Sequence, residues 1–183
     1  GSGGFIQVGN ADAEVSYTNN NRAFIGVDEG GGSYDASAVS IDAGRLVRLE
    51  ADSSFNVSVA SNADGGGFIS DSDADSVFNV GGATQAILGR GATIDTRSAR
   101  MRAGYSGITG KVESDATSGG LFGGASADNT GTVDPSAEVV VQGSGLDLFA
   151  SQGVDLLAFN ADPTFTQSSD ATCYCIGPSD GNN

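Results

Sequence analysis

The clearest regular pattern in the chain is an alternation of apolar and polar residues over positions 41–51. Val47 and Leu49 would point to one face of a strand, and Arg48 and Glu50 would point to the other face. A period of two residues is typical of a β-strand with one buried face. The segment therefore predicts a strand, and it serves as a reference for the rest of the chain.

This pattern recurs further along the sequence. Residues 148–158 repeat the order apolar-x-Ala-x-x-x-Val-x-Leu-x-Ala of residues 41–51 without a gap, 107 positions later. A looser copy lies between the two at residues 94–103. There Arg48 and Leu49 correspond to Arg100 and Met101. The chain is therefore predicted to be built from repeats of about 53 residues.

Other positions agree with this period. The pairs at a spacing of 53 include Val59 with Val112, Ser61 with Ser114, Ala63 with Ala116, Ala74 with Ala127 and Asp75 with Asp128. Gly66 and Gly67 likewise match Gly119 and Gly120, which indicates that one backbone turn is needed twice. In the first part of the chain, residues 24–27 align with residues 77–80, and the spacing drifts upstream of them.

The pattern predicts an all-β fold. Candidate strands of 4–6 residues recur between Gly, Asn and Asp clusters, and no segment has helical periodicity. We favour a β-solenoid of stacked short strands, with a β-sandwich as the alternative. A coil of roughly 18–26 residues would give two or three coils per repeat, and seven to nine coils would make a rod of roughly 40 Å.

The repetitive domain is expected to cover residues 1–160. From Asp162 onward the alternation is lost, and the remaining residues are polar and rich in turn formers. Residues 161–183 are therefore predicted to be a polar C-terminal tail, a cap or a connector to a neighbouring subunit.

Charge narrows the range of partners. The chain has 23 Asp and Glu against 8 Lys and Arg, a formal net charge of −15, and no basic residue follows Lys111. This charge argues against nucleic acid and against anionic membrane surfaces as partners. No apolar run approaches the 18 residues of a membrane span, so no membrane insertion is expected. Acidity of this size favours solubility and attraction to divalent cations.

The chain has no histidine. That excludes Ser–His–Asp and Cys–His catalysis by this chain alone. Carbohydrate-active enzymes with β-helical folds use paired carboxylates, and acids are plentiful here, but no spacing singles out a pair. We therefore expect no enzymatic activity, no catalytic residue and no required cofactor, and a β-helical carbohydrate-active enzyme is only a distant alternative.

Asp71, Asp73 and Asp75 have the alternate spacing of a calcium-binding loop. They are the candidate metal ligands, with calcium as the candidate ion. The EF-hand pattern fails, because Ser76 stands where it has Gly and Gly82 stands where it has Glu. The alternative is a solvated acidic turn.

The only cysteines are Cys173 and Cys175. Two residues so close along a strand would be strained if bonded to each other. They are therefore candidates for disulfides to a neighbouring subunit, and two free thiols in a tail are the alternative. Two thiols alone do not complete a zinc site.

One resemblance is carried by residues 119–124, 132–141, 143–150 and 154–158. They read as a Gly-rich turn, Val-x-Pro-x-x-x-Val, Gly-x-Gly, and strand pairs ending in Ala. This order resembles repeats in giant secreted bacterial surface proteins of the haemagglutinin-like and adhesin kind. The resemblance covers about residues 28–160. It implies a β-solenoid, secretion to the cell exterior or surface, and a structural or adhesive role.

Together these features predict a secreted structural subunit of a fibre, sheath or adhesive surface structure, whose partner is another copy of itself. Assembly would proceed by stacking of strand edges. The alternative is a monomeric adhesin module that binds a glycan or a divalent cation.

Overall fold

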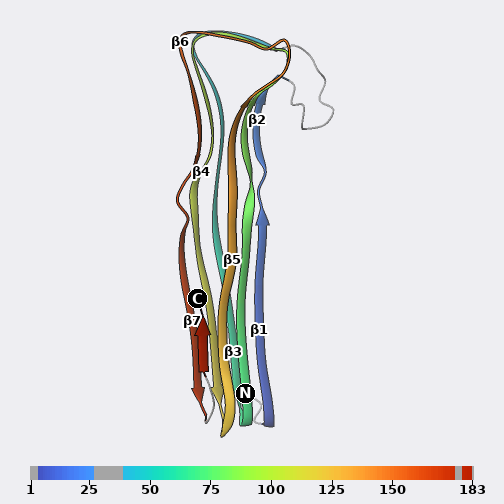
Figure 1. The fold of residues 1–183 in the computed structure, drawn as a ribbon, viewed down its shortest axis with the longest axis vertical. Coiled ribbons are helices and arrows are strands. Elements are labelled where there is room, and N and C mark those ends of the chain that lie inside the picture. The colour runs from blue at the N-terminus through green and yellow to red at the C-terminus, as the bar shows by residue number, and fades with distance from the viewer. Residues whose placement is uncertain (1–3, 27–38, 176–178, 183) are drawn as a thin grey trace.

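The computed structural model describes residues 4–26, 39–175 and 179–182. These residues are almost entirely β-strand (Figure 1). The strands are β1 (Gly4–Thr18), β2 (Asn21–Ile25), β3 (Val39–Leu88), β4 (Ala92–Gly119), β5 (Phe122–Val141), β6 (Asp147–Asn160), β7 (Thr164–Tyr174) and β8 (Ser179–Asn182). The all-β prediction is confirmed. No helix able to cross a membrane occurs in the described part of the chain.

Every pairing between the described strands is parallel. The strand order is β6-β4-β3-β5-β8, and the sheet stays open. β3 belongs to two sets of strands, because its first half pairs with β4 and its second half pairs with β1, β2 and β5. We call the first half of β3 with β4, β6 and β7 the β4 layer. The second half of β3 with β1, β2, β5 and β8 is the β5 layer.

The two layers run along the long axis of the molecule, and the arrowheads of β1 and β7 point in opposite directions (Figure 1). β3 reverses direction near residues 65–67, and the chain turns again at Gly120 and Leu121, where the Leu121 amide donates to the Phe68 carbonyl at 3.1 Å. The matching Gly pairs in the sequence therefore mark a turn that is used twice.

The pairing register follows the sequence repeat. Val59 pairs with Val112 in the β4 layer, and Asp75 pairs with Asp128 in the β5 layer, each 53 positions apart. Arg100 stands between Arg48 on one side and Asp155 on the other. One repeat therefore carries the chain once along the β4 layer and once back along the β5 layer. The expectation of two or three coils per repeat, and of seven to nine coils in a rod, is wrong.

The expected short strands are also wrong. β4 has 28 residues and β5 has 20. The Asp and Ser cluster at residues 71–76, a candidate for a calcium-binding loop or an acidic turn, lies inside β3, with Asp side chains outward and Ala or Ser side chains inward. Polar residues at alternate positions are solvated on the open face, so they do not need to break the strand.

The first repeat is offset differently. β1 and β2 pair with β3 at a spacing of 63, as Phe24 does with Ile87, whereas Val39 pairs with Ala92 at a spacing of 53. The chain thus carries ten additional residues between Ile25 and Val39. The predicted alignment of residues 24–27 with 77–80 is wrong for this reason, and Val27 lies outside the described residues.

Part of the segment expected as a tail belongs to the sheet. β7 pairs with β4 from Thr109–Thr164 to Gly119–Tyr174, and β8 pairs with β5 at Ala125–Asp128. The predicted division after residue 160 does not coincide with an end of the sheet.

The interior lies between the two layers. Its middle part holds an apolar cluster of Phe55, Val57, Val59, Phe78, Val80, Tyr105, Ile108 and Val112. A second cluster, which includes Leu49, Leu88, Ile94 and Met101, lies in another part of the interior. Burial of these side chains, at roughly 25 cal/mol per Å² of apolar surface, is the main favourable contribution to folding.

A third part of the interior is thin and built from small side chains. Its apolar members are Ala63, Ala74, Ala116, Ala125 and Ala127. Buried serines bond across the layers: Ser61 and Ser76 are 2.9 Å apart, and Ser76 donates to the Glu113 carbonyl at 2.7 Å. Because these hydroxyls have partners, the small core is tolerated without a desolvation penalty.

Candidate functional site

The two open sides of the layered sheet are the candidate functional surface. On one side, β1 and β2 pair only with the second half of β3, and the first half of β3 pairs only with β4, among the described strands. We call this side the leading side. It leaves a row of backbone donors and acceptors without a strand neighbour in the described part of the chain.

The opposite side is formed by β5, β6, β7 and β8, and we call it the trailing side. β6 and β7 pair only with β4 among the described strands. β8 covers β5 at Ala125–Asp128, so residues 129–141 of β5 have no outer strand within the described chain. Both sides therefore present open parallel edges.

Large apolar side chains are exposed on both sides. They include Phe5, Ile6 and Val8 on the leading side and Phe149, Val154, Leu156 and Leu157 on the trailing side. Leu156 is 52% exposed, whereas Met101, its neighbour in the same ladder, is 3% exposed. Val154 and Leu156 would be buried by one more set of strands, as their neighbours Ala99 and Met101 in β4 are. Phe149 and Leu157 instead lie on the outward face.

The interior also opens at the leading side. A groove of about 440 Å³ is lined by Val15, Tyr17, Phe55 and Val57, with Ser54, Asn56 and Ser58 beside them. Val15 packs against the middle apolar cluster, to which Phe55 and Val57 belong. The groove is therefore the open end of the core between the two layers.

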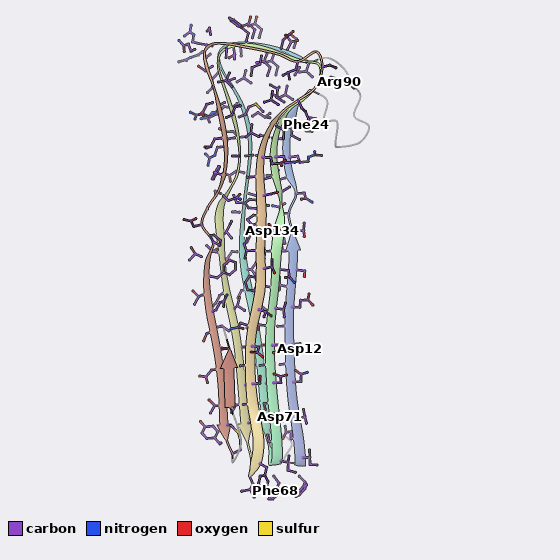
Figure 2. All side chains as sticks on the ribbon, viewed as in Figure 1. Asp12, Phe24, Phe68, Asp71, Arg90 and Asp134 are labelled. Atoms are coloured by element: carbon purple, nitrogen blue, oxygen red, sulfur yellow. A yellow bond between two sulfur atoms is a disulfide. The ribbon has the colours of Figure 1, made fainter. Side chains whose placement is uncertain are left out.

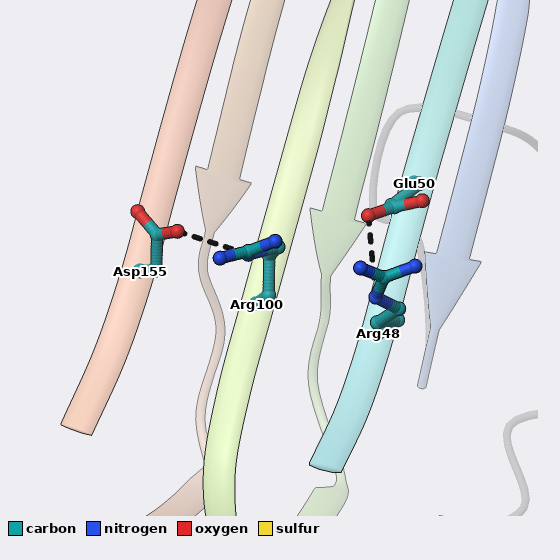
Figure 3. A network of polar contacts seen from close by, with 4 residues as sticks. All are labelled: Arg48, Glu50, Arg100 and Asp155. Carbon is teal, nitrogen blue, oxygen red and sulfur yellow. Dashed lines mark hydrogen bonds and ion pairs between the residues drawn. The ribbon is translucent and has the colours of Figure 1, made fainter. Parts of the chain in front are cut away.

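Ion pairs mark the outward row of the β4 layer. Arg100 Nε lies 3.0 Å from Asp155 Oδ2 on the neighbouring strand β6, and Arg48 Nε lies 3.6 Å from Glu50 Oε1 on its own strand (Figure 3). Both pairs are solvent-exposed, so each stabilises the fold only weakly. Their ladder order, Arg48, Arg100, Asp155, leaves Arg48 at the leading side and Asp155 at the trailing side.

The predicted calcium ligands lie on the outward face of β3. Asp71, Asp73 and Asp75 occupy alternate positions of one strand, so their backbones are spaced by roughly 6.6 Å. The described residues contain no group of three or more His, Cys, Asp or Glu side chains that could hold a metal ion. The three carboxylates therefore form a row along the strand, and calcium binding by them stays a prediction.

A second acidic row runs across the strands. Asp75 pairs with Asp12 on one side and with Asp128 on the other. Burial is the largest cause that raises the pKa of Asp75, followed by the carboxylates of Asp73, Asp128 and Asp12. Figure 2 shows Asp12 and Asp71 toward the same end of the molecule as Phe68. Sequence reasoning missed this row, although the match of Asp75 with Asp128 was a signal for it.

The two cysteines are bonded to each other within the chain. Cys173 lies in β7 opposite Ser118 and packs against the alanine cluster. A bond from either cysteine to a neighbouring subunit would have to replace this one. The intersubunit disulfide stays a prediction.

Aromatic residues from successive strands of the β5 layer stack at the end of the molecule where Phe68 lies (Figure 2). The Phe5 and Phe68 ring centroids are 4.9 Å apart and nearly parallel, and Phe122 meets Phe68 edge to face at 5.8 Å. All three rings remain exposed. This row could not be predicted from the 53-residue period, because Phe5 is 63 positions and Phe122 is 54 positions from Phe68.

Comparisons of the chain with protein-family models, with curated protein sequences and with solved structures find no significant match.

Proposed function

We propose that the chain is a segment of a β-solenoid with a structural role, acting as a secreted subunit of an extracellular fibre, sheath or adhesive surface structure. Its partner is a second copy of the same chain, and the contact is the stacking of open strand edges. The resemblance to giant haemagglutinin-like surface proteins supports the location and the role. No catalytic step is part of this proposal.

The observation that carries the proposal is the pair of open, apolar sides. Tyr17 on the leading side is 43% exposed and Leu156 on the trailing side is 52% exposed, whereas their ladder neighbours Val80 and Met101 are each 3% exposed. Soluble proteins usually protect open strand edges with charge, bulges or a covering segment, because such edges template further pairing. Here the edges are long and carry apolar side chains, which favours association.

The size of the contact is adequate for a stable assembly. The 28 residues of β4 span roughly 90 Å of backbone, and facing layers are about 10 Å apart. One end face thus has an area on the order of 900 Å², close to the roughly 800 Å² per partner of a standard interface. Backbone hydrogen bonds between the strand edges of two copies, along both layers, would also fix the orientation in which the copies stack.

Negative-stain electron microscopy of the purified chain, with and without millimolar calcium, tests the proposal. We expect filaments of uniform width in both conditions. Leu156→Lys, on the trailing side, should abolish them, whereas Leu121→Lys, at a turn and 45% exposed, should not.

Dispersed particles of one chain in every condition would overturn self-assembly. They would favour the alternative of a monomeric adhesin module that binds a glycan or a divalent cation. Filaments that disappear on chelation of calcium would instead assign Asp71, Asp73 and Asp75 a role in the contact.

A further inference from the structure

We propose that assembly is head to tail, with β6 of one copy pairing in parallel with the first half of β3 of the next. The predicted contact sets Leu156 beside Leu49 of the second copy and Asp155 beside its Arg48. This inference rests on the proposed function and adds the polarity and the register of the contact.

The first argument is the sequence of the two edges. Within the chain, Leu49 pairs with Met101, and Met101 pairs with Leu156. Residues 148–158 of the trailing side have the same pattern of apolar and small residues as residues 41–51 of the leading side. A second copy in parallel register would therefore continue the inward ladders with residues of the same kind and on the same face.

Charge is the second argument. Asp155 already bonds Arg100 on its inner side at 3.0 Å. In the head-to-tail register its outer neighbour is Arg48 of the second copy, so one carboxylate stands between two guanidinium groups. Opposite charges at neighbouring strand positions stabilise pairing, and like charges destabilise it.

The third argument is the interior. Val57 lines the groove at the leading side, and its ladder runs through Gly110 to Phe165 in β7. Phe165 is partly buried and stacks on Phe78 at 4.9 Å between ring centroids. In the proposed register, Val57 and the groove of the second copy meet Phe165, so the open core is closed by an apolar side chain.

A cysteine cross-link tests the register. Glu50 and Leu157 share one outward ladder with Arg102 between them. Within one chain they are two strands apart, about 10 Å, which is too far for a disulfide, whereas in the stack they are neighbours at about 4.8 Å. The variant is Glu50→Cys with Leu157→Cys, in a background where Cys173 and Cys175 are replaced by Ser.

Under mild oxidation we expect this double variant to give a ladder of dimers, trimers and longer species on non-reducing gels. Each single-cysteine variant should stay monomeric under the same conditions. A single-cysteine variant that forms dimers would show a head-to-head contact and would overturn the proposed polarity. Filaments in microscopy without any cross-link would overturn the register while leaving self-assembly intact, and absence of both would overturn self-assembly as well.

A charge variant gives an independent test. Arg48→Glu should raise the protein concentration needed for assembly about fivefold, because Asp155 would then meet a like charge. Lys111→Glu is the matched control, since it changes the net charge equally. Lys111 lies on β4, where its neighbours on both sides, Ser58 and Thr166, belong to the same copy. Equal effects of the two substitutions would overturn the contact between Arg48 and Asp155.

Discussion

At the scale of single residues, the row of Asp12, Asp75 and Asp128 places three carboxylates at neighbouring positions of adjacent strands, where like charges destabilise the fold. The pKa of Asp75 is raised first by burial and then by the carboxylates around it. Because its pKa is higher in the folded chain than in the unfolded chain, folding favours the protonated form. Stability from this site is therefore present below the usual pKa of about 3.9 and is lost as pH rises through the folded value.

Asp75→Asn should accordingly raise the melting temperature at pH 7 by an amount that corresponds to a few tenths of a kcal/mol up to about 1 kcal/mol. Near pH 3 the gain should vanish, because the carboxyl is then protonated in both states. Asp64→Asn is the control, since Asp64 pairs with Thr117 rather than with another acid. A gain that persists at pH 3 would contradict the electrostatic explanation.

At position 104 a glycine is needed because a neighbouring ring leaves no space for a side chain. The Phe159 ring lies where a Cβ at Gly104 would be, whereas a Cβ at Gly107 would meet only Ser54 Cβ at 3.8 Å. Gly104→Ala should therefore destabilise the fold by about 1–3 kcal/mol. Gly107→Ala should be neutral or slightly stabilising. Urea unfolding of both variants measures the difference, and equal effects would show that Phe159 can move aside.

Sequence reasoning succeeded at this scale where the second and third repeats keep the 53-residue spacing, and it failed for residues 24–27, because Phe24 and Ile25 pair at a spacing of 63. The matches of Leu49 with Met101 and of Val59 with Val112 are true neighbours in the sheet. It failed for the acidic row and for the Phe159 contact with Gly104, because both need the register of a third strand. The offset of 63 between β1 and β3 hid Asp12 from a search at a spacing of 53.

At the scale of elements, the long strands show how periodicity can outweigh turn propensity. Gly, Asn and Asp clusters indicated frequent turns, yet β3 continues through most of them on both sides of its reversal near residues 65–67, with inward and outward positions alternating through most of its length. The turns near Gly66 and Gly120 form where both repeats have glycine. A single cluster of turn residues was therefore a weak signal, and a repeated one was strong.

β8 occupies a strand position that the next copy in a stack would need. Gly9 pairs with Ser72, Ser72 with Ala125, and Ala125 with Ser179, so Ser179 and Gly9 occupy equivalent positions in successive strands. In a head-to-tail stack, β8 of one copy takes the place beside β5 that the start of β1 of the next copy would otherwise take. We expect β8 to limit assembly.

Deletion of residues 176–183 should therefore accelerate filament growth, as measured by light scattering at a fixed protein concentration. A matched variant with Gly and Ser replacing these residues keeps the chain length constant. Slower growth after deletion would mean that β8 contributes to the contact between copies.

At the scale of the whole molecule, the net negative charge opposes association of copies through their apolar edges. A charge of −15 on each copy repels a second copy at low ionic strength, and salt screens that repulsion. Assembly should thus increase when NaCl is raised from about 20 mM to about 500 mM, where the Debye length falls to roughly 4 Å. Pelleting by ultracentrifugation measures the assembled fraction. Filaments that dissolve in salt would instead assign the contact mainly to ion pairs such as Arg48 with Asp155.

The repeat length was the most informative feature of the sequence for the overall shape. It predicted which strands are neighbours, but not that one repeat makes a single long circuit of the two layers. Strand length depends on how far the inward positions stay apolar or small, and Ser61, Ser72 and Ser76 read as polar breaks. Their hydroxyls bond across the layers, so these positions are interior ones.

The axial rise of the filaments, measured by electron cryo-microscopy, tests the central claim most directly. The β4 layer contributes three successive strands per copy, which at about 4.8 Å each predict a rise of about 14 Å along the fibre axis. A rise near 14 Å, with the 4.8 Å strand spacing along the axis, is the predicted result. A repeat near 29 Å would indicate alternating head-to-head copies, and particles of a single chain at all concentrations would contradict stacking altogether.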